Sequence, residues 1–216
     1  NVLVALTQRE EVVALEPATG KVRWRRKVGT SRIAAMPVAG AALVVATVDS
    51  LFRLEAAGGK VTHRTASPGT LVSPWIVYHG ALVGGTTDSQ LVSINPQDLG
   101  LNWSVRVDAP VLGSPAARGD TLFAVSRRGT LYRIPPGTPP TAEQIVELDW
   151  PVTAPVTIVR DQILLGGADG AIRALRSDGS EIWRLQVWRP VELGPVALED
   201  GILAIGGEGD LHRYRR

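Results

Sequence analysis

The sequence feature that most limits the fold is a repeat with a period of about forty residues. Three sets of positions show it independently, and neighbouring members of each set lie 37 to 41 residues apart. The apolar set is Leu15, Leu54, Ile94, Ile134, Leu175 and Tyr214, the proline set is Pro37, Pro74, Pro115, Pro155 and Pro195, and the turn set is Ser50, Ser89, Gly129, Gly170 and Gly209. One period in three unrelated sets indicates a chain built from repeated structural units.

Each unit contains four short runs with the composition of β-strands. In residues 152–187, four runs of five to eight residues are β-branched or alternate in polarity, and turn residues such as Asp169-Gly170 separate them. No stretch of eleven residues has the periodicity of a helix. We therefore predict an all-β chain that forms a β-propeller of four-stranded antiparallel blades. An irregular β-sandwich is the alternative, although it would not need a single repeated period.

The repeat predicts about six blades, of which the first and the last are incomplete. We expect 22 strands, because the chain opens on the second strand of its first unit and ends on the third strand of its sixth. The approximate units are 1–29, 30–69, 70–109, 110–150, 151–189 and 190–216, which together make a single propeller domain over 1–216. Our hypothesis is that about 15 to 20 residues before Asn1 close the ring by completing the last blade. The alternative is a fragment of a larger seven- or eight-bladed propeller.

A motif that recurs between the third and fourth strands resembles that of a known repeat family. Residues 14–24 read ALEPATGKVRW, and 174–183 (ALRSDGSEIW) and 93–103 (SINPQDLGLNW) are variants of this motif. The second unit has His63 where the tryptophan is expected, and the fourth unit lacks the motif. The pattern resembles the A-x-D-x-x-T-G-x-x-x-W signature of the pyrroloquinoline-quinone-type (PQQ-like) propeller repeat. In repeat type the chain is similar to the BamB-like outer-membrane assembly lipoproteins, which have eight blades.

The motif also explains the most basic stretch of the chain, KVRWRRK (Lys21 to Lys27). A turn followed by this run predicts the outermost strand of a blade, and charge on an edge strand opposes pairing with another chain. The alternative is a nucleic-acid-binding strip, but no stacking aromatic residues accompany the run. We expect Trp24 and its counterpart Trp183 to pack against the neighbouring blade.

The composition excludes several kinds of chemistry. The chain has no cysteine, which rules out disulfides, thiolate catalysis and zinc–thiolate sites. The formal net charge is only +2, which does not indicate a nucleic-acid-binding protein. The three histidines, His63, His79 and His212, do not have the spacing of metal ligands. Quinone-dependent dehydrogenases share this type of repeat, but the resemblance implies for them a larger propeller, a calcium ion and in many an adjacent-cysteine pair. We therefore expect no catalytic, cofactor-binding or metal-binding residue and no cofactor.

Tryptophan and arginine residues that do not follow the repeat are the candidates for partner contact. They are Trp150, Trp188, Arg189, Arg127, Arg128 and Arg32, and the predicted loops bring them to one face of the propeller. The alternative for both tryptophans is that they pack beneath the loops and cap the blades. Trp75 and Tyr78 are expected to line the core or the central funnel. The loop PPGTPPTAEQ (Pro135 to Gln144) is expected to be the longest irregular insert and to lie on the opposite face.

These observations favour a non-enzymatic scaffold for protein–protein interaction in a bacterial cell-envelope complex. We expect one or more protein partners, no nucleic acid, and a location in the periplasm or on the extracytoplasmic face of the envelope. Association with the membrane would come through a partner or through an N-terminal anchor. Two alternatives remain open: a ligand-sensing extracytoplasmic domain of a receptor or kinase, and a quinone-dependent dehydrogenase.

Overall fold

The computed structural model describes residues 2–7, 11–29, 34–38, 41–187, 189–198, 201–205 and 211–215. In these segments all regular secondary structure consists of β-strands. The 22 strands form six separate sheets in which neighbouring strands are antiparallel. The first sheet contains β1 (Leu3–Leu6), β2 (Glu11–Leu15) and β3 (Val22–Lys27). The second contains β4 (Ala34–Val38), β5 (Ala42–Ala46), β6 (Ser50–Glu55) and β7 (Val61–Ala66), and the third contains β8 (Ile76–Tyr78), β9 (Ala81–Gly85), β10 (Gln90–Ile94) and β11 (Leu101–Arg106).

The chain continues in the same order through the other three sheets. The fourth contains β12 (Ala116–Arg118), β13 (Thr121–Val125), β14 (Thr130–Ile134) and β15 (Glu143–Glu147). The fifth contains β16 (Thr157–Val159), β17 (Gln162–Gly166), β18 (Ala171–Leu175) and β19 (Glu181–Gln186). The sixth contains β20 (Val196–Leu198), β21 (Gly201–Ile205) and β22 (Leu211–Arg215).

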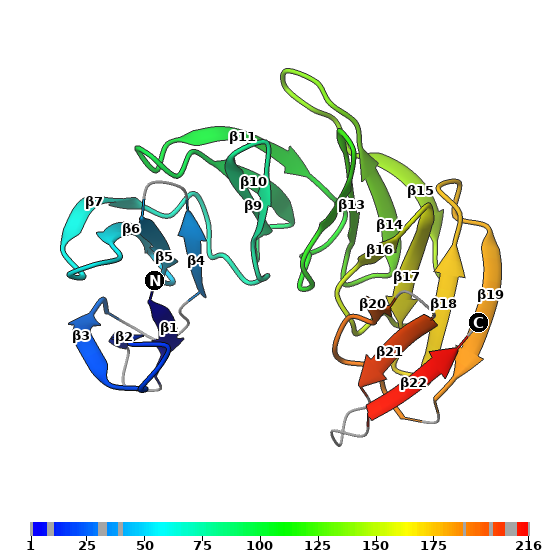
Figure 1. Cartoon of the computed structure of the whole chain (residues 1–216). Helices are drawn as coiled ribbons and strands as arrows, with labels where there is room; N and C mark the ends of the chain where they lie inside the picture. Colours follow the sequence, from blue (N-terminus) through cyan, green and yellow to red (C-terminus); the bar gives the residue numbers. More distant parts are fainter. Residues whose placement is uncertain are drawn as a thin grey trace.

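The six sheets follow one another around an arc, with the first strand of a complete sheet toward the inside and the fourth at the rim (Figure 1). This radial arrangement is that of a β-propeller, and we call the sheets blades 1 to 6. The predicted fold class is therefore confirmed. So are the 22 strands and the incomplete first and last blades, which have three strands each among the described residues.

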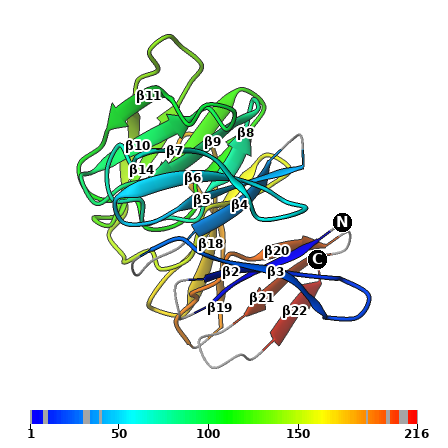
Figure 2. The same ribbon diagram turned by 90° about the vertical axis from the view of Figure 1, so that its left-hand side faces the viewer.

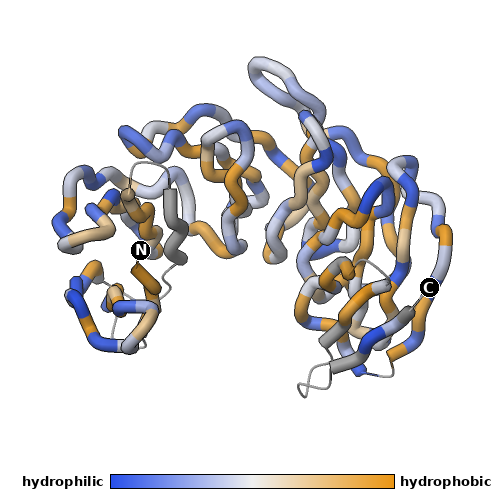
Figure 3. Tube along the Cα trace, in the orientation of Figure 1, coloured by the Kyte–Doolittle hydropathy of each residue, from blue (hydrophilic) through white to orange (hydrophobic). Residues whose placement is uncertain are grey.

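The hydrophobic core lies between neighbouring blades rather than in one central cluster. Val44 and Leu51 of blade 2 pack with Trp75, Leu82 and Ile94 of blade 3 in one buried cluster. Apolar residues are accordingly concentrated along inner strands such as β17 (Figure 3). Burying each such side chain is worth about 1.5–3 kcal/mol, so each blade is stabilised mainly by the next one. Trp75, expected to line the core or the central funnel, lies in the core.

The motif tryptophans connect one blade to the next. The Trp24 indole nitrogen donates a hydrogen bond of 2.9 Å to the carbonyl of Ala56 in the following blade. Gly59, in the turn between β6 and β7, lies so close to the Trp24 ring that an added Cβ would approach it to 2.6 Å. Trp103 packs, partly buried, against the cluster that blades 3 and 4 share. The structure thus places these side chains where the motif predicted, at the joint between blades.

Strand β3 lies at the outer edge of blade 1, as its charge pattern predicted. Arg23 pairs with Glu16 at 3.4 Å, and Arg25 with Glu11 at 3.7 Å. The Arg26 guanidinium donates to the Gly59 carbonyl at 2.9 Å. Several cations of the run therefore take part in contacts within the protein.

The proline-rich connection between β14 and β15 covers residues 135–142 and projects beyond the neighbouring sheets in both views (Figure 1 and Figure 2). It is the longest of the connections between third and fourth strands, which have five or six residues in blades 1, 2, 3 and 5, but its predicted bounds are wrong. Its last two expected residues, Glu143 and Gln144, belong to β15, and the connections before β8, β12, β16 and β20 are longer by one residue. Strand pairing in blade 4 continues to Glu143, opposite Arg133, and this pairing shortens the loop.

Candidate functional site

The predicted contact residues lie in the connections that the sequence indicated. Arg127 and Arg128 form the turn between β13 and β14, Trp150 lies between β15 and β16, and Arg189 lies between β19 and β20. Connections of these two kinds leave the blades on the same face, because successive strands are antiparallel. Trp188 and Arg32 lie outside the described residues.

A hollow on this face lies between the connections of blades 4 and 5. It has a volume of about 350 Å³, and its walls include Leu112, Arg127, Pro151, Val152 and Val156. The structure thus places Arg127 in the same hollow as Pro151, the residue that follows Trp150. Among the described residues, Arg128, Trp150 and Arg189 do not line it. We call this hollow the 4–5 groove.

The apolar wall of the 4–5 groove includes an exposed leucine. Leu112, in the connection between β11 and β12, leaves 48 % of its surface accessible. The centres of protein contact sites are more apolar than the rest of the surface, and arginine is enriched in them. The sequence analysis missed Leu112, although an apolar residue before Gly113 in a loop was the available signal.

Trp150 sits beside the groove as a cap on blade 5. The Arg173 guanidinium stacks over its ring at 4.0 Å, and Trp150 packs partly buried on the core shared by blades 4 and 5. The Arg173 side chain is only 4 % exposed. These contacts support the blade-cap alternative for Trp150, and the indole is fixed in place beside Pro151.

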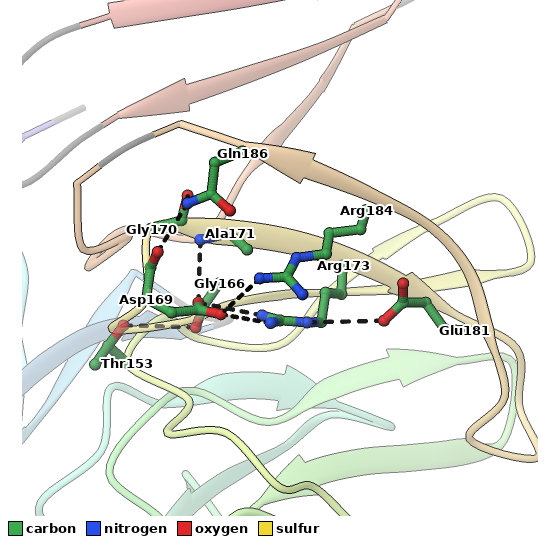
Figure 4. A network of polar contacts seen from close by, with 9 residues as sticks. All are labelled: Thr153, Gly166, Asp169, Gly170, Ala171, Arg173, Glu181, Arg184 and Gln186. Carbon is green, nitrogen blue, oxygen red and sulfur yellow. Dashed lines mark hydrogen bonds and ion pairs between the residues drawn. The ribbon is translucent and has the colours of Figure 1, made fainter.

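A polar network anchors Arg173 (Figure 4). The Asp169 carboxylate accepts hydrogen bonds from Arg173, from Arg184 at 3.2 Å and from the backbone nitrogen of Ala171 at 3.1 Å. The Gln186 amide donates to the carbonyls of Asp169 and Gly170 at 2.8 and 3.0 Å. The hydrogen bond from Arg173, which outweighs burial, holds the pKa of Asp169 below its ordinary value. The network therefore holds the Arg173 guanidinium in its orientation over the tryptophan ring.

Arg128 replaces an acidic residue that recurs in the turns between second and third strands. The corresponding residues of blades 2, 3 and 5 are Asp49, Asp88 and Asp169. In blade 4 this residue is Arg128, and it follows Arg127, which lines the groove. Nearby, burial would raise the pKa of Asp108, but hydrogen bonds from Ser126, Thr130 and Tyr132 and the charge of Arg128 together lower it.

A second hollow lies on the opposite face, between Trp103 of blade 3 and the 135–142 loop of blade 4. Its volume is about 400 Å³, and Tyr78 and His79 also line it. The Tyr78 hydroxyl donates to the Asp120 carbonyl at 2.8 Å, so its ring bridges blades 3 and 4, in keeping with the prediction that it lines the core. Within the described residues there is no group of three or more acidic or histidine side chains able to hold a metal ion. The described part of the chain also contains no helix that could span a membrane.

Comparisons with known proteins agree with this fold. A family model described as outer membrane protein assembly factor BamB matches residues 8–139. BamB from Moraxella catarrhalis superposes with a TM-score of 0.70 at 18 % identity, and the match covers all of this chain and 79 % of that one. A computationally designed protein, Ika8, gives 0.77 at 14 % identity with 68 % of its chain covered, and BBS1N in complex with ARL6DN gives 0.79 at 15 % identity with 73 % covered. Both matches cover all of this chain. No curated protein sequence matches significantly.

Proposed function

Because the chain belongs to the family of outer membrane protein assembly factor BamB, we propose that it is a non-enzymatic propeller that binds protein partners within an assembly complex of the bacterial envelope. The family supports an envelope role and a protein partner. The identity of 18 % to the Moraxella protein supports only the fold, so the contact residues have to be argued from this chain.

The observation that carries the proposal is the 4–5 groove. It combines an exposed leucine, an arginine and a hollow of about 350 Å³ on a face built from rigid blades. A rigid surface loses little conformational entropy on binding, which favours docking of a folded or extended partner. The Arg173–Trp150 stack holds one side of the groove in place without itself lining it.

The charge pattern gives the proposed partner a chemical character. Arg128 replaces the acidic turn residue found at this position in blades 2, 3 and 5, and the adjacent Arg127 lines the groove. A partner segment with an apolar residue for Leu112 and an acidic residue for Arg127 would complement the groove. On this proposal the protein acts in the periplasm, where it positions a membrane-associated partner.

Site-specific photocrosslinking in the cells that produce the protein tests this function. A photoreactive phenylalanine derivative at Leu112 is expected to crosslink to a subunit of the outer-membrane assembly machinery, identified by mass spectrometry. The matched control is Val77, which is 56 % exposed but lies in β8, away from the groove. Equal crosslinking from both positions, or no assembly subunit among the products from Leu112, would contradict the proposal.

A further inference from the structure

The joint between blades 3 and 4 differs from the joint between blades 1 and 2. Between blades 1 and 2, the five-residue turn before β7 lies over the motif tryptophan: the Ala56 carbonyl accepts the Trp24 hydrogen bond, and Gly59 lies against the ring. Between blades 3 and 4, the corresponding connection is the eight-residue loop 135–142, and a hollow of about 400 Å³ remains between this loop and Trp103. We call this hollow the 3–4 pocket. It lies on the face opposite the 4–5 groove, so a ligand bound here would be independent of the partner proposed above.

The indole nitrogen of Trp103 is available to a ligand. Trp24 donates its indole hydrogen to Ala56 at 2.9 Å, and Trp183 donates to Gln162 at 3.1 Å. No described residue accepts the corresponding hydrogen of Trp103, and the nitrogen is not buried. Because Trp103 lines the pocket, it offers the ligand an aromatic ring and one unused hydrogen-bond donor.

A buried hydroxyl group also lines the pocket. Ser93 of β10 is only 1 % exposed, and it faces Trp103 in the pairing of β10 with β11. The residues at the same position in the other two blades with a motif tryptophan are Ala14 and Ala174. Blade 3 therefore has a polar group where the packing of the tryptophan requires only a methyl group.

Asn102 adds a hydrogen-bond acceptor beside this hydroxyl. Its amide nitrogen donates to the hydroxyl oxygen of Ser93 at 3.3 Å, and it lines the same pocket. The hydroxyl hydrogen of Ser93 and the amide oxygen of Asn102 have no partner within the described part of the chain. A serine hydroxyl can donate while it accepts, and an amide oxygen accepts. The two side chains thus offer a ligand one donor and one acceptor.

The other walls of the pocket are mainly apolar. Leu122 and Ile134 line it from blade 4, and the loop adds Pro135, Pro136 and Pro140. Among the described residues, no aspartate, glutamate, lysine or arginine lines it. A charged ligand would therefore lose its hydration without gaining an ion pair, which is costly. The pocket is suited to a neutral ligand, and its volume is in the range of small-ligand sites, about 300–1,000 Å³.

Two further polar side chains at the pocket are already engaged by the next blade. The Tyr78 hydroxyl donates to the Asp120 carbonyl at 2.8 Å, and the His79 imidazole pairs with the Asp120 carboxylate at 3.0 Å. These contacts hold the turn between β8 and β9 against blade 4. Ser93, Asn102 and Trp103 are therefore the side chains with unused hydrogen-bonding groups for a ligand.

We propose that the 3–4 pocket binds a neutral saccharide that carries an acetamido group, such as an N-acetylhexosamine. A pyranose ring has a face of C–H groups, which packs on the indole ring of Trp103. The acetamido group has a carbonyl acceptor, an N–H donor and a methyl group. The carbonyl matches the donors of Ser93 and Trp103, the N–H matches the oxygen of Asn102, and the methyl group matches the proline wall. A proline-rich peptide also packs on aromatic rings, but its prolines have no N–H for Asn102.

Titration with N,N′-diacetylchitobiose tests the proposal, with cellobiose as the matched disaccharide that has no acetamido group. The NMR signal of the Trp103 indole N–H, assigned with Trp103→Phe, reports the site, and calorimetry gives the affinity. We expect the Trp103 signal to shift while the signal of Trp24, whose hydrogen is bonded to Ala56, stays in place. Cellobiose should bind at least about fivefold more weakly, because it lacks the amide and the methyl group.

Two substitutions separate ligand contacts from folding, because each inserts a residue that the repeat already has at that position. Ser93→Ala introduces the alanine of blades 1 and 5, and Asn102→Thr introduces the counterpart of Thr62 in blade 2. Each should weaken binding of the acetylated sugar about three- to tenfold, while circular dichroism shows a folded protein that melts cooperatively. The control is Ser104→Ala, which should bind unchanged because Ser104 points to the other face of β11 and does not line the pocket.

Three results would overturn the proposal. They are no shift of the Trp103 signal with diacetylchitobiose up to about 10 mM, equal affinity for cellobiose, and unchanged affinity in either the Ser93→Ala or the Asn102→Thr protein. A proline-rich peptide that shifts the Trp103 signal at lower concentrations than the sugar would also overturn it, and would assign the pocket to peptide recognition.

Discussion

At the scale of single residues, the facing pair of third-strand and fourth-strand positions at a joint is used differently in different blades. Trp24 joins blades 1 and 2 through its ring and its indole nitrogen, whereas Arg53 joins blades 2 and 3 through Gln97. His63, expected to stand in for a tryptophan, pairs with Arg53 in the register of a motif tryptophan but is exposed. The joint is therefore kept while its chemistry changes from apolar packing to hydrogen bonding.

The Asp169–Arg173 contact predicts a dependence of stability on pH. Since the pKa of Asp169 is lower in the folded protein than in the unfolded chain, the ionised carboxylate stabilises the fold. This contribution is complete above the ordinary aspartate pKa of about 3.9 and is lost as the pH falls through the lower pKa of the folded state. We expect Asp169→Asn to reduce the free energy of unfolding at pH 7 by about 1–3 kcal/mol, and by less near pH 3.

Urea denaturation of both proteins at the two pH values measures this difference. Asp161→Asn, in the turn between β16 and β17, is the matched control and should leave stability within about 0.5 kcal/mol. A loss for Asp169→Asn that is equally large at both pH values would contradict the assignment.

At the scale of elements, the turn before the fourth strand decides how closely two blades approach. The sequence predicted this turn from its glycines, and Gly59 has a φ of +66°, a conformation that glycine adopts without strain. Only the structure shows a second reason for glycine at position 59. The residue lies against a tryptophan of the preceding blade, where a side chain would not fit.

Two neighbouring glycines therefore separate the effect of the joint from a general effect of glycine. Gly59→Ala should destabilise the protein by about 2–4 kcal/mol, because the new methyl group meets the Trp24 ring and the backbone is strained. Gly58→Ala, with no atom within 4 Å of an added Cβ and no positive φ, should change stability by less than about 1 kcal/mol. Thermal melts followed by circular dichroism measure both, and equal losses would disprove the role of the joint.

At the scale of the whole molecule, the two ends of the arc are less well covered than its middle. Leu3 and Leu6 of β1 are 56 % and 39 % exposed, whereas most residues of the second strands β5, β9, β13 and β17 are buried. Among the described strands, β1 pairs only with β2. Because neighbouring blades stabilise one another through the cores between them, a blade at an end of the arc has fewer stabilising contacts than an inner blade.

Hydrogen exchange should reveal this gradient. We expect amides of β1 and β22 to exchange at least about tenfold faster than those of β9 and β17, since the end blades open without disrupting two joints. Exchange mass spectrometry on peptides covering these strands measures it. Uniform protection along the chain would mean that the arc unfolds only as one cooperative unit.

The sequence by itself determined the architecture, because a forty-residue period with turn residues at constant offsets requires repeated sheets of equal size. It also located the strands, the edge character of β3 and the joint tryptophans, which depend on local alternation and on a motif. The candidate site was only partly predictable. The loops of Arg127 and Trp150 follow from strand counting, but their surroundings depend on residues far away in the chain.

Only the tertiary structure decided that Trp150 is fixed by Arg173 and that Leu112 and Arg127 share one groove. These facts arise where two blades meet, between residues about forty positions apart. A periodic pattern specifies which residues recur, but the space between two units depends on how the particular side chains of both fill it.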